Sequence, residues 1–550
     1  MIAENVSKTY GSHSLKAGLD FRKQRLDRFF QQSNRGSFSF TGAVSGNAIA
    51  DFLLGLPTST TRAVGKGIYN NIHQTRQGYY FQDDWRVSQK LTLNIGLRYE
   101  IMGVPEDSGG NLRTFDFKTQ KLVPEFGVTQ GLYKPDHHNF APRFGFAWSP
   151  IRLGGKQTVL RGGYGIFYNM PQMQVYTLMG NNPPASLTES FNVAEGRRLT
   201  LANGFPGSGT LPAFPAILPI ADDYKPGYVQ SWSFGIQQEL FRSTVLEVGY
   251  VGSKSTRMDQ TETLNMPTPG PGPNQIRRPN PNIGAIRFFS SDSNSTYHGL
   301  QTRLERRLQH GLTLLAAYTF SKTTDDNFTS TSTPLNTARW AQDPLNRKAE
   351  KSQSSFNIPH RLSFTYLWQP FTGQQLAGSR ALGMVAGNWQ LSGTTTFQSG
   401  LPFTVLVPGD PANLGTFGTN IRANRVGPSQ PDGFHRDPFL WLSPTAFRDP
   451  DKATDAKCIA SPGSCNYYGN LGRLTESGPG VNNWDIGVSR RFPFTERQAL
   501  EFRFEMFNAF NRAHFDTPSN VTGTSVFLRV TSTNPQIPNQ DLQFALKYVF

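Results

Sequence analysis

The last ten residues, DLQFALKYVF (541–550), alternate between two kinds of side chain. One face carries large apolar groups, namely Leu542, Phe544, Leu546, Tyr548 and Phe550. The other face carries Gln543, Ala545 and Lys547. The preceding segment ALEFRFEMFNAF (499–510) repeats the pattern, with Glu501, Arg503 and Glu505 on its polar face. A period of two residues predicts β-strands, and a face of alternating charges does not belong in a protein core.

The same period recurs along the whole chain in paired segments. We expect 15 strands, at 4–10, 13–23, 79–87, 91–100, 139–150, 158–169, 227–240, 243–256, 295–308, 312–325, 360–371, 389–403, 483–494, 499–512 and 541–550. Most connections within a pair are very short, such as SQK after Val87, FRS (241–243) and QHG (309–311). The connections between pairs are long, at 101–138, 170–226, 257–294, 326–359 and 404–482.

This asymmetry of the connections favours one architecture. A sandwich or propeller has turns of mixed length at both ends, whereas a transmembrane barrel has short periplasmic turns and long outer loops. A strand of about ten residues, tilted near 45°, spans roughly 23 Å, close to the roughly 25 Å apolar band of an outer membrane. Because hydrocarbon offers no hydrogen bonds, a sheet can cross it only as a closed cylinder. The sequence therefore predicts an all-β, transmembrane antiparallel β-barrel.

The composition agrees with this architecture. The mean hydropathy is −0.44, and no apolar run approaches the roughly 18 residues that a spanning helix needs. Many aromatic residues lie near predicted strand ends, where interface girdles occur, although aromatic residues favour strands in any case. They are Tyr79, Tyr80, Phe81, Trp85, Tyr99, Trp148, Tyr164, Tyr168, Trp232, Tyr250, Trp368, Trp389, Trp484 and Phe550.

The net charge of +15 raises nucleic acid as a partner. The basic residues are nevertheless scattered among acidic ones, as in RLERR (303–307), and no run of five exists. We therefore expect no nucleic-acid partner and assign the excess to the lumen and the outer loops. Luminal charges such as Arg98, Arg303, Glu305, Arg307, Glu501 and Arg503 have two interpretations. They either line a path or contact a plug, or they neutralise one another on a wall that faces water, which we favour for any single residue.

No catalytic motif stands out, so the sequence does not predict an enzyme or a cofactor. The acidic pairs Asp83-Asp84, Asp222-Asp223 and Asp325-Asp326 would point to opposite faces of a strand. The segment DPDKATD (449–455) lacks the order of a calcium loop. His137-His138 is interpreted as a solvated pair in an outer loop.

The two cysteines, Cys458 and Cys465, lie in CIASPGSC, a stretch rich in Pro, Ser and Gly. Their spacing fits a small loop disulfide in an oxidising compartment. A metal site is disfavoured because there is no further cysteine and His435 is 23 residues away. The first residues, MIAENVSKTYG, have neither the basic nor the apolar region of a secretory signal.

Several segments, taken in order, resemble TonB-dependent outer-membrane receptors. FQDDWRVSQKLTLNIGLRYE (81–100) is similar to a family pattern in which a strand ending in QDxW precedes one reading LTLNxGxRYE. Others resemble the Oar-like subgroup, whose members carry a carboxypeptidase-regulatory-like domain. They are GNAIADFLLGLP (46–57), NFAPRFGFAWSP (139–150), TVLRGGYGIFY (158–168), YVQSWSFGIQQEL (228–240), STYHGLQTRLERR (295–307) and EMFNAFNRAHF (505–515).

The resemblance implies a longer protein with a signal peptide, an extension domain, a TonB box, a plug and 22 strands. Residues 1–550 would then be the C-terminal part of the barrel, with seven strands and the other four parts missing, and would not transport alone. Tyr548 and Phe550 resemble the C-terminal signal that the barrel-assembly machinery recognises. The implied partners are outer-membrane lipid, that machinery, the TonB complex acting through the plug, and an unknown solute.

Three functions follow as hypotheses. The first is energy-coupled uptake of a scarce solute across the outer membrane of a Gram-negative bacterium, with ligand contacts from the long outer loops. The second is a surface barrel in adhesion or signalling that does not pump. The third, a secreted β-propeller enzyme, is disfavoured because the hairpin spacing varies too much for a repeat.

Overall fold

The computed structural model describes most of the chain. The described residues are 1–30, 35–64, 68–124, 131–169, 173–180, 182–183, 187–193, 199–241, 243–309, 311–326, 341–370, 387–415, 421–495 and 497–550. Arg242 and His310, in the predicted short turns, and Phe371, at the end of a predicted strand, lie outside them. So do parts of the predicted long connections 101–138, 170–226, 326–359 and 404–482.

One antiparallel sheet dominates the described structure, and all 15 predicted strands are in it. They are β1 (Ile2–Tyr10), β2 (His13–Phe30), β5 (Ile68–Ser88), β6 (Leu91–Met102), β10 (Asn139–Trp148), β12 (Lys156–Tyr168), β14 (Tyr228–Phe241), β15 (Thr244–Leu264), β16 (Ile286–Gln309), β17 (Leu312–Asp325), β19 (His360–Trp368), β20 (Trp389–Gln398), β25 (Val481–Pro493), β26 (Ala499–Phe507) and β27 (Asp541–Val549). Three two-residue strands, β7 (Glu106–Asp107), β11 (Arg152–Leu153) and β18 (Ser352–Gln353), extend the same sheet.

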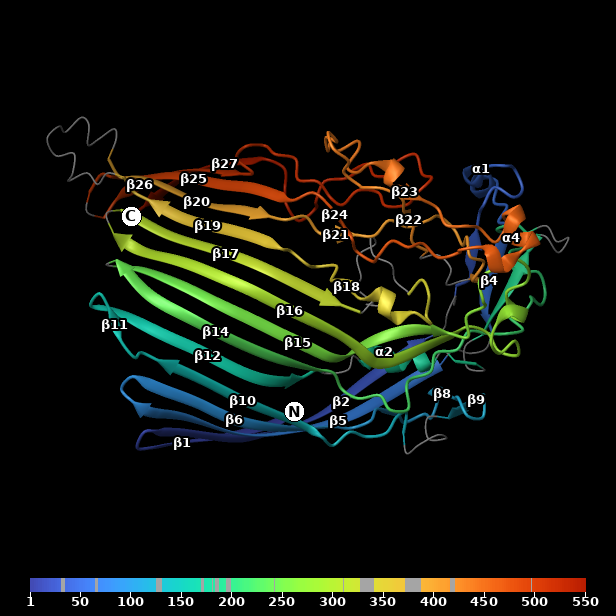
Figure 1. Cartoon of the computed structure of the whole chain (residues 1–550), viewed down its shortest axis with the longest axis horizontal. Coiled ribbons are helices and arrows are strands. Elements are labelled where there is room, and N and C mark those ends of the chain that lie inside the picture. The colour runs from blue at the N-terminus through green and yellow to red at the C-terminus, as the bar shows by residue number, and fades with distance from the viewer. Residues whose placement is uncertain are drawn as a thin grey trace.

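The long strands pair in chain order. Each pairs antiparallel with the long strand before it, from β1 with β2 through to β26 with β27. In the described residues no pairing joins β1 to β27, and the two strands lie at opposite margins of the sheet in Figure 1. Because the number of long strands is odd, β1 and β27 run in the same direction.

The two ends of the sheet differ as predicted. Two residues, Gln89 and Lys90, connect β5 to β6, and other short turns lie at the same end, on the left of Figure 1. The long connections gather at the opposite end, on the right. The strands run obliquely between the two ends, as in a tilted barrel wall.

Several strand boundaries differ from the predictions. β2 continues to Phe30, β5 begins at Ile68, β15 continues to Leu264 and β16 begins at Ile286. These extensions all lie on the long-loop side, beyond the length that crosses hydrocarbon. The predicted ends at residues 403 and 512 were wrong in the other direction, because β20 ends at Gln398 and β26 at Phe507.

The long connections fold into a lobe with small sheets, short helices and buried cores. Its small sheets join β3 (Ser37–Ser39), β4 (Ser59–Val64) and β13 (Leu187–Asn192); β8 (Arg113–Asp116) and β9 (Lys121–Pro124); β21 (Pro402–Phe403) and β24 (Glu476–Ser477); and β22 (Asn424–Arg425) and β23 (Phe447–Arg448). Its helices are α1 (Ala48–Leu53), α2 (Met173–Met179), α4 (Ala456–Ala460) and the 3-10 turns η2 (Gln275–Arg277), η3 (Arg347–Glu350), η5 (Pro444–Ala446) and η6 (Pro462–Ser464). Within the described residues, no helix has the length and apolar character needed to traverse a bilayer.

Candidate functional site

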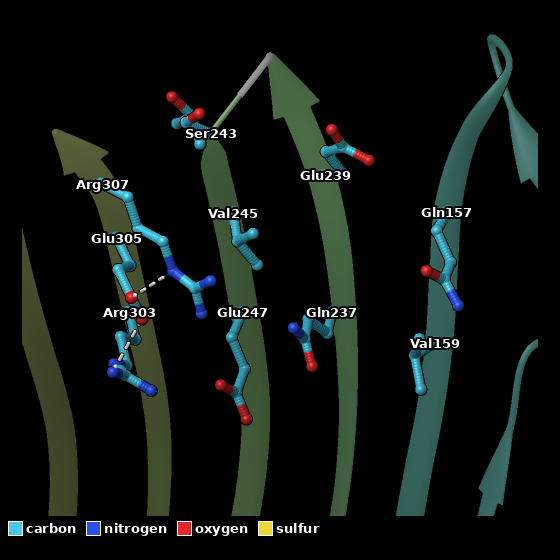
Figure 2. A pocket seen from close by; sticks show the side chains of 11 residues that line it. Gln157, Val159, Gln237, Glu239, Ser243, Val245, Glu247, Arg303, Glu305 and Arg307 are labelled. Carbon is cyan, nitrogen blue, oxygen red and sulfur yellow. Dashed lines mark hydrogen bonds and ion pairs between the residues drawn. The ribbon is translucent and has the colours of Figure 1, made fainter. Parts of the chain in front are cut away.

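The wall of the barrel has a pocket of about 280 Å³ on its inner face. Neighbouring strands β12, β14, β15 and β16 contribute its side chains near their short turns (Figure 2). It is lined by Gln157, Val159, Gln237, Glu239, Ser243, Thr244, Val245, Glu247, Arg303, Glu305 and Arg307. The adjacent outward residues, such as Ile236 and Val248, are apolar and partly exposed. The alternation of each strand therefore produces a polar lumen and an apolar outer face.

The charges of this pocket are only partly paired. Arg303 donates to Glu305 at 2.8 Å, and Arg307 donates to the same carboxylate at 3.3 Å (Figure 2). No cation among the described residues forms an ion pair with Glu239 or Glu247. The pocket thus presents two carboxylates without an ion pair, beside two arginines that share the single carboxylate of Glu305.

Other luminal charges pair with residues of the same strand or of a nearby strand. Arg98 donates to Asp20 at 2.6 Å and to Glu100 at 2.7 Å. Arg503 donates to Glu501 at 2.6 Å. These contacts are what mutual neutralisation predicts for a wall that faces water.

The acidic pairs and the histidine pair do not form joint sites in the described residues. Asp83 contacts His13 at 2.7 Å, whereas Asp84 accepts a hydrogen bond from Lys16 at 3.0 Å on the opposite face. Asp222 pairs with Lys134 at 2.9 Å.

Asp326 accepts from Ser293, while Asp325 pairs with Arg473. The nitrogen of His138 lies 3.4 Å from Asp136, and this histidine is 91% exposed. The residues with these contacts therefore serve local structure.

One of the buried cores of the loop lobe contains three tyrosines. Tyr133, Tyr176 and Tyr224 are buried with Ile72 and Leu112. The hydroxyls of Tyr133 and Tyr176 lie 3.2 Å apart, and Tyr224 donates to Asp259 at 2.6 Å. Burial raises the pKa of all three tyrosines, so they stay neutral donors at physiological pH.

The stability of this core should depend on pH through Asp259, which lies on the part of β15 above the membrane. Burial raises the pKa of Asp259 above its usual value, and the hydrogen bond from Tyr224 opposes that shift only in part. The folded state therefore holds this proton more tightly than the unfolded state. The stability of the folded core should therefore fall as the pH rises from the ordinary carboxyl pKa to the raised pKa of folded Asp259. Above that raised pKa the stability should stay at the lower level.

We expect Asp259→Asn to protect the core at pH 7 and to have no effect at pH 3, because the amide oxygen still accepts from Tyr224 without a buried charge. Hydrogen exchange of residues 131–138 and 220–226, corrected for intrinsic rates, measures this. Asp223→Asn, at an exposed neighbouring position, is the control and should change nothing. Equal protection of wild type and Asp259→Asn at pH 7 would contradict the prediction.

Buried ion pairs tie the loops that follow β17 and β20 together. Arg422 donates to Glu350 at 2.7 Å, and both side chains are 1% exposed. Gln342 accepts a hydrogen bond from the Arg422 backbone at 3.1 Å. Arg473 donates to the Glu350 carbonyl at 3.0 Å and pairs with Asp325 at the end of β17. This network fixes the two loops to the barrel rim.

The predicted site residues lie at opposite ends of the molecule. Cys458, in α4, and Cys465, after η6, form a disulfide with their Cα atoms 5.7 Å apart. Asp451 lies beside the two sulfurs, but bonded sulfurs are not thiolate ligands, so this group does not make a metal site. Tyr548 and Phe550 lie at the short-turn end of β27, 50% and 91% exposed, with ring centroids 6.0 Å apart.

The sequence did not single out two parts of this site. Glu239 and Glu247 were assigned only to strands. Side chains alternate between the two faces of a strand, and this alternation, counted from the outward residue Ile236, would have placed both carboxylates in the lumen. Arg422 and Glu350 are 72 residues apart, in loops without a period. No local signal marks such a pair.

The chain was also compared with known proteins. A family model described as "Outer membrane beta barrel domain" matches residues 1–543. The chain belongs to this family. This outer-membrane barrel therefore resides in the outer membrane of a Gram-negative bacterium, as predicted. The comparison with curated proteins found no match.

Solved structures resemble the barrel at low sequence identity. The outer membrane transporter YddB from Escherichia coli has a TM-score of 0.50 and 12% identity, over 99% of this chain and 52% of that one. The siderophore receptor PirA from Acinetobacter baumannii has a TM-score of 0.45 and 12% identity, over 100% of this chain and 54% of that one. The FrpB iron transporter from Neisseria meningitidis has a TM-score of 0.44 and 12% identity, over 99% of this chain and 54% of that one. The chain spans about half the length of these structures, and the likeness to YddB agrees with the barrel fold.

Proposed function

We propose that this chain is the barrel part of a TonB-dependent outer-membrane receptor of the Oar-like subgroup, and that it takes up a scarce solute. The family, the likeness in fold to YddB and the ordered sequence segments support this proposal. The wall and loops position a solute and change no bond, so the proposed activity needs neither catalysis nor a cofactor.

In this proposal, residues 1–550 are the C-terminal part of a longer receptor that also has a plug and a TonB box. The margins of the sheet carry the argument. Among the described strands, β1 and β27 each pair with one long strand, and both run in the same direction. Closing the cylinder by antiparallel pairing alone therefore needs an odd number of further strands, and seven would give 22. Such closure would leave no open edge in hydrocarbon.

The luminal pocket fits a contact with the plug. Glu239 and Glu247 face the lumen, and no cation among the described residues forms an ion pair with either, although Arg303 and Arg307 line the same pocket. A basic surface on a plug would satisfy both carboxylates. The solute would then bind to the loop lobe above, where long connections supply varied side chains.

Assembly of the barrel is proposed to depend on its aromatic C-terminus. We expect Phe550→Ser to lower the amount of heat-modifiable barrel in the outer membrane, because the assembly machinery would lose an exposed aromatic contact. Phe494→Ser is the control, because Phe494 is 62% exposed in a short turn. Equal amounts of folded barrel for both variants would contradict this role.

The proposed uptake can be tested in cells. The gene that encodes this chain is deleted, and growth is measured on ferric chelates, cobalamin, oligosaccharides and peptides as limiting nutrients. We expect loss of growth on one class of nutrient, the same loss in a strain without TonB, and recovery on complementation with the intact gene. Unchanged growth on every class, together with lost surface attachment, would favour the adhesion barrel instead.

A further inference from the structure

Basic side chains form a strip on the outward face of strands β15, β16 and β17, which lie side by side (Figure 1). In the register of the sheet, His298 lies opposite Lys322 on one side and opposite Gly252 on the other. Lys254 is two residues beyond Gly252. Since directly opposite residues lie about 5 Å apart and diagonal ones about 7–8 Å, these three side chains share one patch. We call Lys254, His298 and Lys322 the basic strip.

An exposed apolar belt fixes the orientation of the basic strip. Tyr250, Leu300 and Phe320 are opposite one another in the register and are 40%, 44% and 51% exposed. Each member of the strip follows or precedes one of these residues by two or four positions, so it shares their outward face. The strip is therefore on the lipid side of the wall and not in the lumen.

The height of the basic strip corresponds to the outer membrane surface. Lys254 is ten residues from the start of β15 and Lys322 ten from the start of β17. Ten residues of tilted strand rise roughly 23 Å, which reaches the outer boundary of the roughly 25 Å apolar band. The ring of Trp232 lies 6.3 Å from that of His298, as expected of an interface aromatic.

The charges of the basic strip are not satisfied by the protein. No carboxylate in the described residues forms an ion pair with Lys254 or Lys322, and both side chains are exposed. The Tyr250 hydroxyl lies 2.6 Å from Nδ1 of His298 and orients the imidazole. The outward-phase carboxylate beyond the strip, Asp326, accepts hydrogen bonds from Ser293 and from the backbone of Asn294.

We propose that the basic strip binds the phosphate groups of lipid headgroups in the outer leaflet. The occupant must be anionic to match two lysines, and it must lie where the apolar belt ends. A phosphorylated lipid meets both conditions, because its chains cover Tyr250, Leu300 and Phe320 while its phosphates reach the basic strip. This site accounts for part of the excess positive charge and holds the barrel at a fixed depth.

Native mass spectrometry of the detergent-solubilised protein tests the proposal, with bis-phosphorylated lipid A as the probe. The variant Lys254→Gln/Lys322→Gln should bind lipid A about 25-fold more weakly than the wild type does. Each lysine near an anionic surface contributes about five-fold to the affinity. The control Lys90→Gln/Arg152→Gln removes two positive charges at the short-turn end and should bind as the wild type does. Phosphatidylcholine and inorganic phosphate should not compete.

Equal lipid A binding by the two double variants would overturn the proposal. Competition by inorganic phosphate alone would also overturn it, because a free anion would then be the ligand. Heat-modifiable migration of each variant shows that the barrel is folded, so a loss of binding reports on the basic strip. Binding should also weaken as salt is raised, since the strip is exposed to solvent.

Discussion

Arg422→Met is expected to destabilise the loop lobe by about 3–5 kcal/mol, the usual cost of leaving one charge of a buried pair alone. Glu350 would keep its charge at 1% exposure and lose the guanidinium 2.7 Å away. Urea-dependent pulse proteolysis of the loops that follow β17 and β20 measures the effect.

Two comparisons make this prediction specific to the buried charge. The double variant Arg422→Met/Glu350→Gln should recover most of the loss, because the neutral amide can still accept from the Gln342 backbone. Arg25→Met breaks an exposed pair with Asp27 and should cost at most about 1 kcal/mol. If Arg422→Met cost no more than Arg25→Met, the Arg422–Glu350 pair would not hold the lobe together.

The second large effect is expected on the lipid face of β14. Ile236 lies five residues from the end of that strand, roughly 12 Å above the short turn and near the middle of the apolar band. Ile236→Arg should therefore cost about 2–4 kcal/mol when folding into phospholipid vesicles is measured.

The adjacent residue supplies a matched control for that substitution. Gln237 lines the luminal pocket with Glu239 and Glu247, so Gln237→Arg places the same charge in water beside carboxylates. Its cost should be small. Equal losses for Ile236→Arg and Gln237→Arg would contradict the assignment of the two faces.

The fold could be predicted from the sequence wherever the membrane imposes a pattern. Phe502 and Arg503 are adjacent, but one faces lipid and the other faces water. This alternation of apolar and charged residues predicted the strand that contains them. Above the membrane both faces of a strand meet water or the loop lobe. In the outer part of β2, which includes Gln24 and Arg25, the alternation is therefore lost, and the end of this strand was predicted too early, at residue 23.

The candidate site was less accessible to sequence reasoning because it depends on contacts between distant residues. Tyr224 and Asp259 lie 35 positions apart and meet only when the loops pack over the barrel. Neither residue stands in a motif. The basic strip was also missed, since Lys254, His298 and Lys322 become neighbours only through the register of three strands.

In an outer-membrane barrel, alternate residues of each strand face lipid and water. The accessibility of spin labels along one strand measures this alternation most directly. Because both native cysteines are in a disulfide, single cysteines introduced from 232 to 239 on β14 can be labelled individually in lipid vesicles. We expect labels at 232, 234, 236 and 238 to be accessible to oxygen, and those at 233, 235, 237 and 239 to a water-soluble relaxation agent. Equal access of the water-soluble agent to both sets would contradict the barrel in the membrane.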